Sequence, residues 1–211
     1  MSGNTRNIQW STLLGKQNTE LFQKLKTPEH IQDYLNSIPF NFSDSLSSPS
    51  ETIRRKSAHC LEGALLAAAV LWYWGYQPCL LDLRSKQGDD DHVVALFRKG
   101  KYWGAISKTN HAILRYRDPI YRSIRELAMS YFHEYFLNTS GEKTLIDYSV
   151  PFSLKRFGVS WLNDEEDLWY VGEALDNATH VRFIPRGTRL RKADQVERKA
   201  GRIVEWEREK K

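Results

Sequence analysis

The chain contains few cysteines and no long apolar run, and both absences narrow what it can be. Two cysteines in 211 residues, Cys60 and Cys79, make no disulfide framework, which favours a reducing compartment and predicts a cytoplasmic protein. No stretch reaches the roughly 18 apolar residues that a membrane span requires. The longest candidate, Ala64–Trp74, predicts a buried helix instead. The first residues, MSGNTRNIQW, lack the apolar core of a signal peptide, so export is not expected.

Motifs for metal or cofactor binding are missing as well. The six histidines and two cysteines show no CxxC, HxxxH or HExxH spacing, so neither a metal site nor a cofactor is predicted. A net charge of +5 is compatible with nucleic-acid binding. In the C-terminal stretch RKADQVERKAGRIVEWEREKK, however, acidic and basic residues alternate, which is typical of a solvated helix. Nucleic acid is therefore not the expected partner, and no feature of the sequence points to a particular oligomeric state.

The length and the residue patterns indicate one main domain with helical additions. A chain of 211 residues with 41% hydrophobic residues can bury a substantial core. Thr27 followed by Pro28 is typical of a helix start and precedes HIQDYLNSI. The serine-rich run FSDSLSSPS is expected to act as a connector. The predicted divisions are a helical lead-in with this connector (1–50), an α+β domain (51–190) and a charged C-terminal helix (191–211).

The centre of the chain predicts a buried helix followed by three strands. The helix ends at Gly75, and the strands are Pro78–Leu83, His92–Phe97 and Tyr102–Ile106, the last two joined by the tight turn RKGK. A second helix is expected after Pro119, then a strand over TLIDYSV, a helix capped by Asp164 and a strand over HVRFI. Helices and strands are segregated, which predicts an α+β fold whose antiparallel sheet packs on the buried helix.

Cys60 stands where a polar segment, SAHCLEG, enters this buried helix. With Ser57 as the N-cap, Cys60 falls in the first turn, where free N–H groups and the helix dipole favour a thiolate. Free cysteine is also among the most buried residue types, so a purely structural role is the competing interpretation. The neighbouring His59 is expected to point away from the thiol, towards the surface. Glu62 is expected to cap the helix start, and Gly63 to permit a close backbone approach.

A nucleophilic cysteine needs a base, and His92 begins a strand directly after DDD. If Lys99 and Gly100 are the two turn residues of the hairpin, His92 lies directly opposite Ser107. Opposed residues in an antiparallel pair point to the same side. The hairpin therefore predicts that Ser107 orients His92.

The order of these parts resembles the transglutaminase-like core, the papain-like cysteine fold shared by transglutaminases and bacterial transglutaminase-like proteases. The resemblance extends over residues 57–110 and rests on the cysteine helix, GYQP before a strand, the histidine strand and the tryptophan strand. It implies that Cys60 is the nucleophile and His92 the general base. It also implies an aspartate on the neighbouring strand that orients the histidine.

At this third position the sequence departs from the family pattern. Ser107 stands where the aspartate is expected. A serine hydroxyl can accept a hydrogen bond from an imidazole but cannot offset the imidazolium charge. Asn110 and Asp118 are the alternative partners for His92. The surrounding stretch, 108–122, is dense in Arg, Tyr and Asn; a solvated strand followed by a helix start is favoured there over the lining of a substrate cleft.

Together these features predict thiol-dependent hydrolysis of an amide or peptide bond. In this hypothesis Cys60 attacks the carbonyl carbon, His92 transfers protons, and Ser107 holds the imidazole. The expected partner is a peptide or protein substrate. The alternative is a non-catalytic, transglutaminase-like domain that binds a peptide or protein with a degenerate triad, which the missing aspartate favours.

Overall fold

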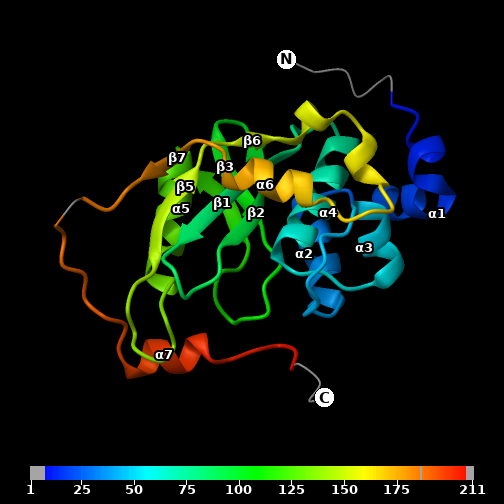
Figure 1. Ribbon diagram of the computed structural model, residues 1–211. Coiled ribbons are helices and arrows are strands. Elements are labelled where there is room, and N and C mark those ends of the chain that lie inside the picture. The colour runs from blue at the N-terminus through cyan, green and yellow to red at the C-terminus, as the bar shows by residue number, and fades with distance from the viewer. Residues whose placement is uncertain (1–7, 186, 208–211) are drawn as a thin grey trace.

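The apolar patterns of the chain produce an antiparallel sheet with several helices packed on one face and a single α-helix on the other (Figure 1). The computed structural model describes residues 8–185 and 187–207. Its α-helices are α1 (Trp10–Lys24), α2 (Pro28–Ser37), α3 (Pro49–Arg55), α4 (Cys60–Tyr73), α5 (Ile124–Tyr131), α6 (Trp169–Asp176) and α7 (Gln195–Gly201). Its strands are β1 (Cys79–Ser85), β2 (His92–Lys99), β3 (Tyr102–Ile106), β4 (Arg117–Tyr121), β5 (Leu145–Ser149), β6 (Phe152–Ser153) and β7 (His180–Arg182). The fold is therefore α+β, as the sequence predicts.

The sheet has the strand order β4-β3-β2-β1-β5-β7, and β6 pairs with β1. One core cluster fills the space between the sheet and α1, α2, α4 and α6, and a second cluster packs the opposite face against α5. The edge strand β4 contains Pro119, which lacks an N–H and is therefore tolerated at the edge of a sheet. The expectation of a solvated strand and then a helix start in the stretch 108–122 agrees with β4 and the beginning of α5 at Ile124.

Helix α4 is the central element of the first core cluster. Every residue from Glu62 to Trp72 is buried, as expected for a helix that is apolar on all sides. The indole of Trp72 stacks on Trp161 with ring centroids 6.1 Å apart. After the helix, Gly75 adopts a positive φ of 91°, a conformation that glycine adopts without strain. The helix thus lies within the core over Glu62–Trp72, and its first residue is Cys60.

The hairpin of β2 and β3 differs from the expected register by one turn residue. Lys99 pairs with Tyr102, so the two turn residues are Gly100 and Lys101 rather than Lys99 and Gly100. The reason is that a two-residue hairpin turn requires a positive φ at its first position, and Gly100, with φ 62°, supplies it there. The prediction that His92 lies directly opposite Ser107 is therefore wrong, although the two side chains still meet, as described below.

The N-terminal lead-in packs into the core rather than lying apart from it. Thr27 caps α2 as predicted, accepting a hydrogen bond from the backbone N–H of His30 at 3.3 Å. Side chains of α1 and α2, such as Phe22 and Leu35, belong to the same core cluster as α4. Residues 45–49 of the serine-rich run are buried. The expected domain boundaries stay predictions, but this run is an integral part of the packed structure.

Two predicted helix starts are wrong in detail. The N-cap of α4 is His59 rather than Ser57, because the His59 side chain reaches a backbone N–H of the first turn. The helix expected after Asp164 begins at Trp169 with the apolar Leu168 at its N-cap, so Asp164 is not its cap. The two helices differ at their starts: a side chain caps α4, whereas the N-cap of α6 makes no side-chain hydrogen bond.

The charged C-terminal helix is shorter than the sequence predicts. Helix α7 covers Gln195–Gly201 and is capped by Asp194, whose carboxylate accepts from two backbone N–H groups of the first turn. Residues 203–207 leave the helix and lie in extended or bent conformations. The rest of the predicted helix, residues 208–211, lies outside the described residues, as do residues 1–7 of the lead-in.

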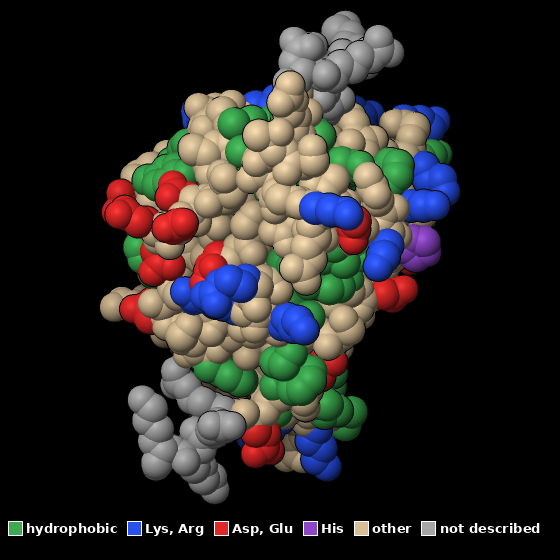
Figure 2. Space-filling view, turned by 90° about the vertical axis from the view of Figure 1, so that its right-hand side faces the viewer, with side chains coloured by type: hydrophobic (Ala, Val, Ile, Leu, Met, Phe, Trp, Pro, Cys, Tyr) green, Lys and Arg blue, Asp and Glu red, His purple; other side chains and the backbone are tan. Residues whose placement is uncertain are grey.

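Helix length and surface charge bear on two expected absences, a membrane and nucleic acid as partners. In the described part of the chain, no helix is long and apolar enough to cross a membrane. On the face shown in Figure 2, acidic and basic side chains both occur, interspersed with hydrophobic ones. The described part of that face therefore presents both signs of charge.

Replacing Gly63 by alanine is expected to lower the free energy of unfolding by about 1–3 kcal/mol. The reason is that a Cβ added at Gly63 would lie 2.4 Å from Cβ of Lys108. Gly172 in α6 is the matched control, because its added Cβ would lie 3.3 Å from Leu46 and alanine favours the helix. Urea unfolding of both variants measures the difference. An unchanged midpoint for Gly63→Ala would contradict the close approach of Lys108 to α4.

Candidate functional site

Cys60 is the first residue of α4 and lines a cavity of about 560 Å³. Its side chain is half-buried, and its Sγ lies 4.0 Å from the backbone oxygen of Asp91, in the loop that leads into β2. His59 and His92 line the same cavity. The predicted location of Cys60 in the first turn of the buried helix is correct, and the structure places a histidine on each side of its thiol.

His92 is buried at the start of β2 and is oriented by Ser107. Its Nε2 lies 2.8 Å from Oγ of Ser107, and that hydroxyl lies 2.5 Å from the backbone oxygen of Leu114. A serine hydroxyl carries a single proton, which goes to the Leu114 carbonyl. Oγ therefore accepts from His92, so Nε2 carries a proton and Nδ1 is the nitrogen that can gain or lose one.

The hydrogen bond between His92 and Ser107 survives the error in the predicted register for a geometric reason. Moving the turn by one residue displaces every cross-strand pairing by two positions. Residues two positions apart on a strand point to the same side. Ser107, one residue beyond β3, therefore stays on the side of His92 and reaches it diagonally.

Gln32 of α2 fixes the backbone of Ser107 from the N-terminal part of the chain. Its Oε1 accepts from the Ser107 N–H at 2.9 Å, and its Nε2 donates to the Ser107 carbonyl at 2.8 Å. Nε2 also donates to Asn36 at 2.9 Å, and the Gln32 side chain is buried. The sequence contains no local signal for this contact, because it joins residues 75 positions apart.

The electrostatics around Cys60 favour its thiolate. Burial raises the pKa of the thiol, but hydrogen bonds and charges from His59 and His92 outweigh burial and lower the pKa to about 5. For Cys79, the other cysteine, burial is the dominant effect and raises the pKa. The two thiols of the chain thus differ in pKa, and Cys60, at the helix start, is the more acidic.

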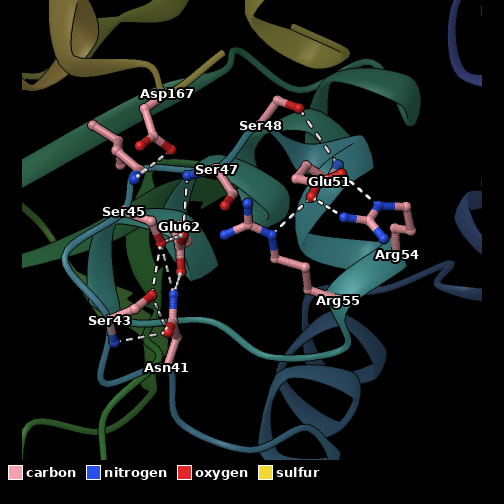
Figure 3. A network of polar contacts seen from close by, with 11 residues as sticks. Asn41, Ser43, Ser45, Ser47, Ser48, Glu51, Arg54, Arg55, Glu62 and Asp167 are labelled. Carbon is pink, nitrogen blue, oxygen red and sulfur yellow. Dashed lines mark hydrogen bonds and ion pairs between the residues drawn. The ribbon is translucent and has the colours of Figure 1, made fainter. Parts of the chain in front are cut away.

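Beneath Cys60, Glu62 is fully buried and holds the start of α4 (Figure 3). Burial raises the pKa of a carboxyl, but the His59 charge and several hydrogen bonds outweigh it and lower the pKa of Glu62. The carboxylate accepts from Asn41 Nδ2 (2.9 Å), Ser45 Oγ (3.1 Å), Ser47 N (2.9 Å) and His59 N (3.0 Å). Glu62 caps the helix, as expected, and also ties the serine-rich run to the residue that precedes Cys60.

His59 does not lie at the surface, which corrects the prediction made for it. Its Nε2 lies 2.7 Å from the backbone oxygen of Ser45, and its Nδ1 accepts from the Leu61 N–H at 3.2 Å, which requires the neutral imidazole. Burial lowers the pKa of His59, but the charges of Cys60 and Glu62 raise it to about 9. Protonation would replace the Leu61 hydrogen bond by ionic contacts with these two groups.

The two alternative partners predicted for His92 lie elsewhere. Both oxygen and nitrogen of the Asn110 side-chain amide are engaged by the backbone of Trp206. Asp118 is exposed on the edge strand β4. Within residues 8–185 and 187–207, Ser107 is therefore the side chain that the structure brings to Nε2 of His92.

Lys108 is a second buried residue of the site region that the sequence did not reveal. Its Nζ donates to the backbone oxygens of Leu35 (2.9 Å) and Ile38 (2.6 Å) at the end of α2. Burial lowers the pKa of this ammonium group to about 8. The stem of Lys108 lies against Gly63, so a side chain rather than a backbone makes the close approach expected there. Among the described residues, no group of three or more His, Cys, Asp and Glu side chains is arranged to hold a metal.

The Glu62→Gln variant is expected to unfold with a free energy lower by about 1–3 kcal/mol at neutral pH, because an amide NH₂ would face buried donors. The folded-state pKa of Glu62 lies below its ordinary value of 4.5, so above pH 4.5 the carboxylate makes its full contribution to the stability of the folded protein. This contribution is lost as the pH falls towards the folded-state pKa. The deficit of the variant should therefore shrink in acid. Urea unfolding from about pH 7 to pH 3 measures it.

The matched control is Glu165→Gln, since Glu165 is an exposed glutamate on the same fold. It is expected to change the free energy of unfolding by less than about 0.5 kcal/mol at neutral pH. A Glu62→Gln variant as stable as this control would show that the hydrogen bonds of Figure 3 do not hold the helix start.

No family model matches the chain, and no curated protein matches it. The resemblance to the transglutaminase-like core thus depends on the residues and the geometry described above, and what it implies is a proposal.

Proposed function

We propose that the chain is a thiol-dependent hydrolase of amide or peptide bonds, related in its site to the transglutaminase-like enzymes. The observation that carries the proposal is the pairing of Cys60, whose pKa is lowered to about 5, with an imidazole whose Nε2 proton is held by Ser107. This leaves Nδ1 of His92 as the nitrogen that can exchange a proton with the thiol or a substrate.

The proposed reaction has two steps. In the first, the Cys60 thiolate attacks the carbonyl carbon of the amide, and the His92 imidazolium gives its Nδ1 proton to the departing amine as the C–N bond breaks. The product is a thioester on Cys60. In the second, Nδ1 takes a proton from water while the water oxygen attacks the thioester carbon. The C–S bond then breaks, which releases the acid and restores the thiolate and the imidazolium.

The start of α4 supplies a donor for the oxyanion of both steps. The backbone N–H of Cys60 donates to no atom of residues 8–185 and 187–207. It lies at the positive end of the helix dipole, where a developing negative charge is stabilised. We assign this N–H as one oxyanion donor. The N–H of Leu61 is directed at Nδ1 of His59 while that imidazole is neutral, and protonation of His59 releases it.

A second candidate function is peptide or protein binding without catalysis. It is favoured by one observation: the partner of His92 is the neutral hydroxyl of Ser107 rather than a carboxylate. A hydroxyl orients the ring but does not compensate an imidazolium charge. In this alternative the cavity beside Cys60 holds a peptide, and the thiol is not used as a nucleophile.

Iodoacetamide labelling distinguishes the reactivity of the two cysteines. In the Cys79→Ala variant, Cys60 is expected to react at neutral pH, with a labelling rate that falls in acid around pH 5. Adding His92→Ala should raise the midpoint by about 1–3 pH units, because a charge partner of the thiolate is lost. Mass spectrometry of the labelled peptide gives the rates.

The matched control is Cys60→Ala, in which Cys79 is the remaining thiol and should react slowly, because burial raises its pKa. Labelling of Cys60 with a midpoint near about 8.5, the value for an ordinary thiol, would remove the main support for the hydrolase.

Hydrolysis is tested with a mixture of fluorogenic peptidyl amides. The wild type is expected to release the amine, Cys60→Ala to release none, and His92→Ala to be slower by about 10²–10⁴-fold. Ser107→Ala should lie between the wild type and His92→Ala, since Ser107 positions the base without transferring a proton. If the wild type is no more active than Cys60→Ala while both bind the peptides equally, the binding function is correct and the hydrolase is not.

A further inference from the structure

The last described residues of the chain run beside the candidate site as an extended segment. In Figure 1 this segment follows α7 below the end of the sheet. We call residues 203–206 the tail segment and residues 110–112 the rim. The two are antiparallel, with a bridge between His111 and Val204. The backbone hydrogen bonds are Ala112 N to Ile203 O (3.0 Å) and Glu205 N to Asn110 O (2.8 Å).

The side chain of Asn110 completes this pairing. Its Nδ2 donates to the backbone oxygen of Trp206 at 2.8 Å, and its Oδ1 accepts from the Trp206 N–H at 2.8 Å. The amide therefore binds the donor and the acceptor of one residue of the tail segment. These contacts involve only backbone atoms of the tail segment, so they are open to any extended peptide regardless of its side chains.

The rim belongs to the same cavity as the thiol. Asn110 and His111 line the cavity together with Cys60 and His92. Gly201, at the end of α7, lines it as well, and its backbone oxygen lies 3.1 Å from Nδ1 of His111. The tail segment thus pairs with a rim whose Asn110 and His111 line the cavity.

Two apolar side chains of the tail segment are exposed, whereas Trp206 is partly buried and its indole nitrogen is enclosed without a hydrogen-bond partner among the described residues. Ile203 is 60% exposed and Val204 is 40% exposed, although both are large and apolar. One ionic contact adds to the backbone pairing, between Glu205 and Arg115 at 3.2 Å, and both of its side chains are partly exposed. A segment held chiefly by backbone hydrogen bonds can be exchanged for another extended peptide that makes the same bonds.

We propose that the rim, with Asn110 and Arg115, is the binding edge for an extended peptide that carries an acidic residue opposite Arg115. The tail segment occupies this edge as an internal competitor and leaves it when such a peptide binds. That the bound peptide is then cleaved by Cys60 rests on the proposed function; that it binds does not.

The binding edge is tested in the full-length Cys60→Ala variant, so that binding is measured without thiol chemistry. The probe is a fluorescently labelled peptide, RIVEWE, with the sequence of residues 202–207. A tethered segment competes at an effective concentration on the order of 1 mM. Adding Glu205→Pro removes the backbone N–H that donates to the backbone oxygen of Asn110, and it removes the ionic contact with Arg115. The tail segment then competes less well, so the peptide should bind about tenfold more tightly. Glu205→Ala keeps the N–H and should give a smaller gain.

Two further variants assign the binding to the edge itself. In the Glu205→Pro background, Asn110→Asp keeps the size of the side chain but removes its donor to the peptide carbonyl, and the gain should be lost. Arg115→Glu should abolish binding of RIVEWE and restore it for RIVKWE, a reversal that an unfolded protein could not produce. Equal affinity for RIVEWE in Cys60→Ala and in the Cys60→Ala, Glu205→Pro double variant would overturn the proposal. So would the absence of this charge reversal. Tight binding without hydrolysis by the wild type would leave the edge established and reject the hydrolase.

Discussion

The site depends on one buried charge, the carboxylate of Glu62. A charge that is removed from water must be matched by hydrogen bonds, and Glu62 receives them from the serine-rich run and from the residue before Cys60. The run therefore cannot act as a loose connector, because its Ser45 and Ser47 complete this shell. The same interaction fixes where α4 begins. It places His59 at the N-cap and Cys60 at the first helical position, at the positive end of the helix dipole.

A second set of contacts holds the imidazole of His92. His92 is held by Ser107, and Ser107 by Gln32 of the N-terminal helix α2. The imidazole is thus positioned by a neutral chain of hydrogen bonds, which defines its tautomer without a carboxylate. In the proposed hydrolase the charge of the imidazolium is balanced by the Cys60 thiolate itself. In a triad with an aspartate, the carboxylate balances the imidazolium charge. In this proposal the Cys60 thiolate balances it, so the mechanism requires Cys60 to be ionised.

The sequence predicts well what local patterns control and poorly what distant contacts control. The buried helix, the three central strands and the position of Cys60 follow from apolar runs and turn residues. The predicted hairpin register is wrong by one turn residue, because the requirement for a positive φ places Gly100 first in the turn. The positions of Gln32 and Lys108 depend on partners 70 or more positions away in the chain, so no local pattern contains them. The hydrogen bond between His92 and Ser107 is predicted in spite of that register error, because strand parity keeps both side chains on the same side.

The central claim is that Cys60 is ionised at neutral pH, and the ultraviolet absorbance of its thiolate tests this most directly. The measurement is the absorbance of the wild type minus that of Cys60→Ala, followed across pH at equilibrium. The account predicts a thiolate signal that is complete at neutral pH and disappears in acid with a midpoint at about 5. A signal that appears only above about pH 8, as for an unperturbed thiol, would contradict it.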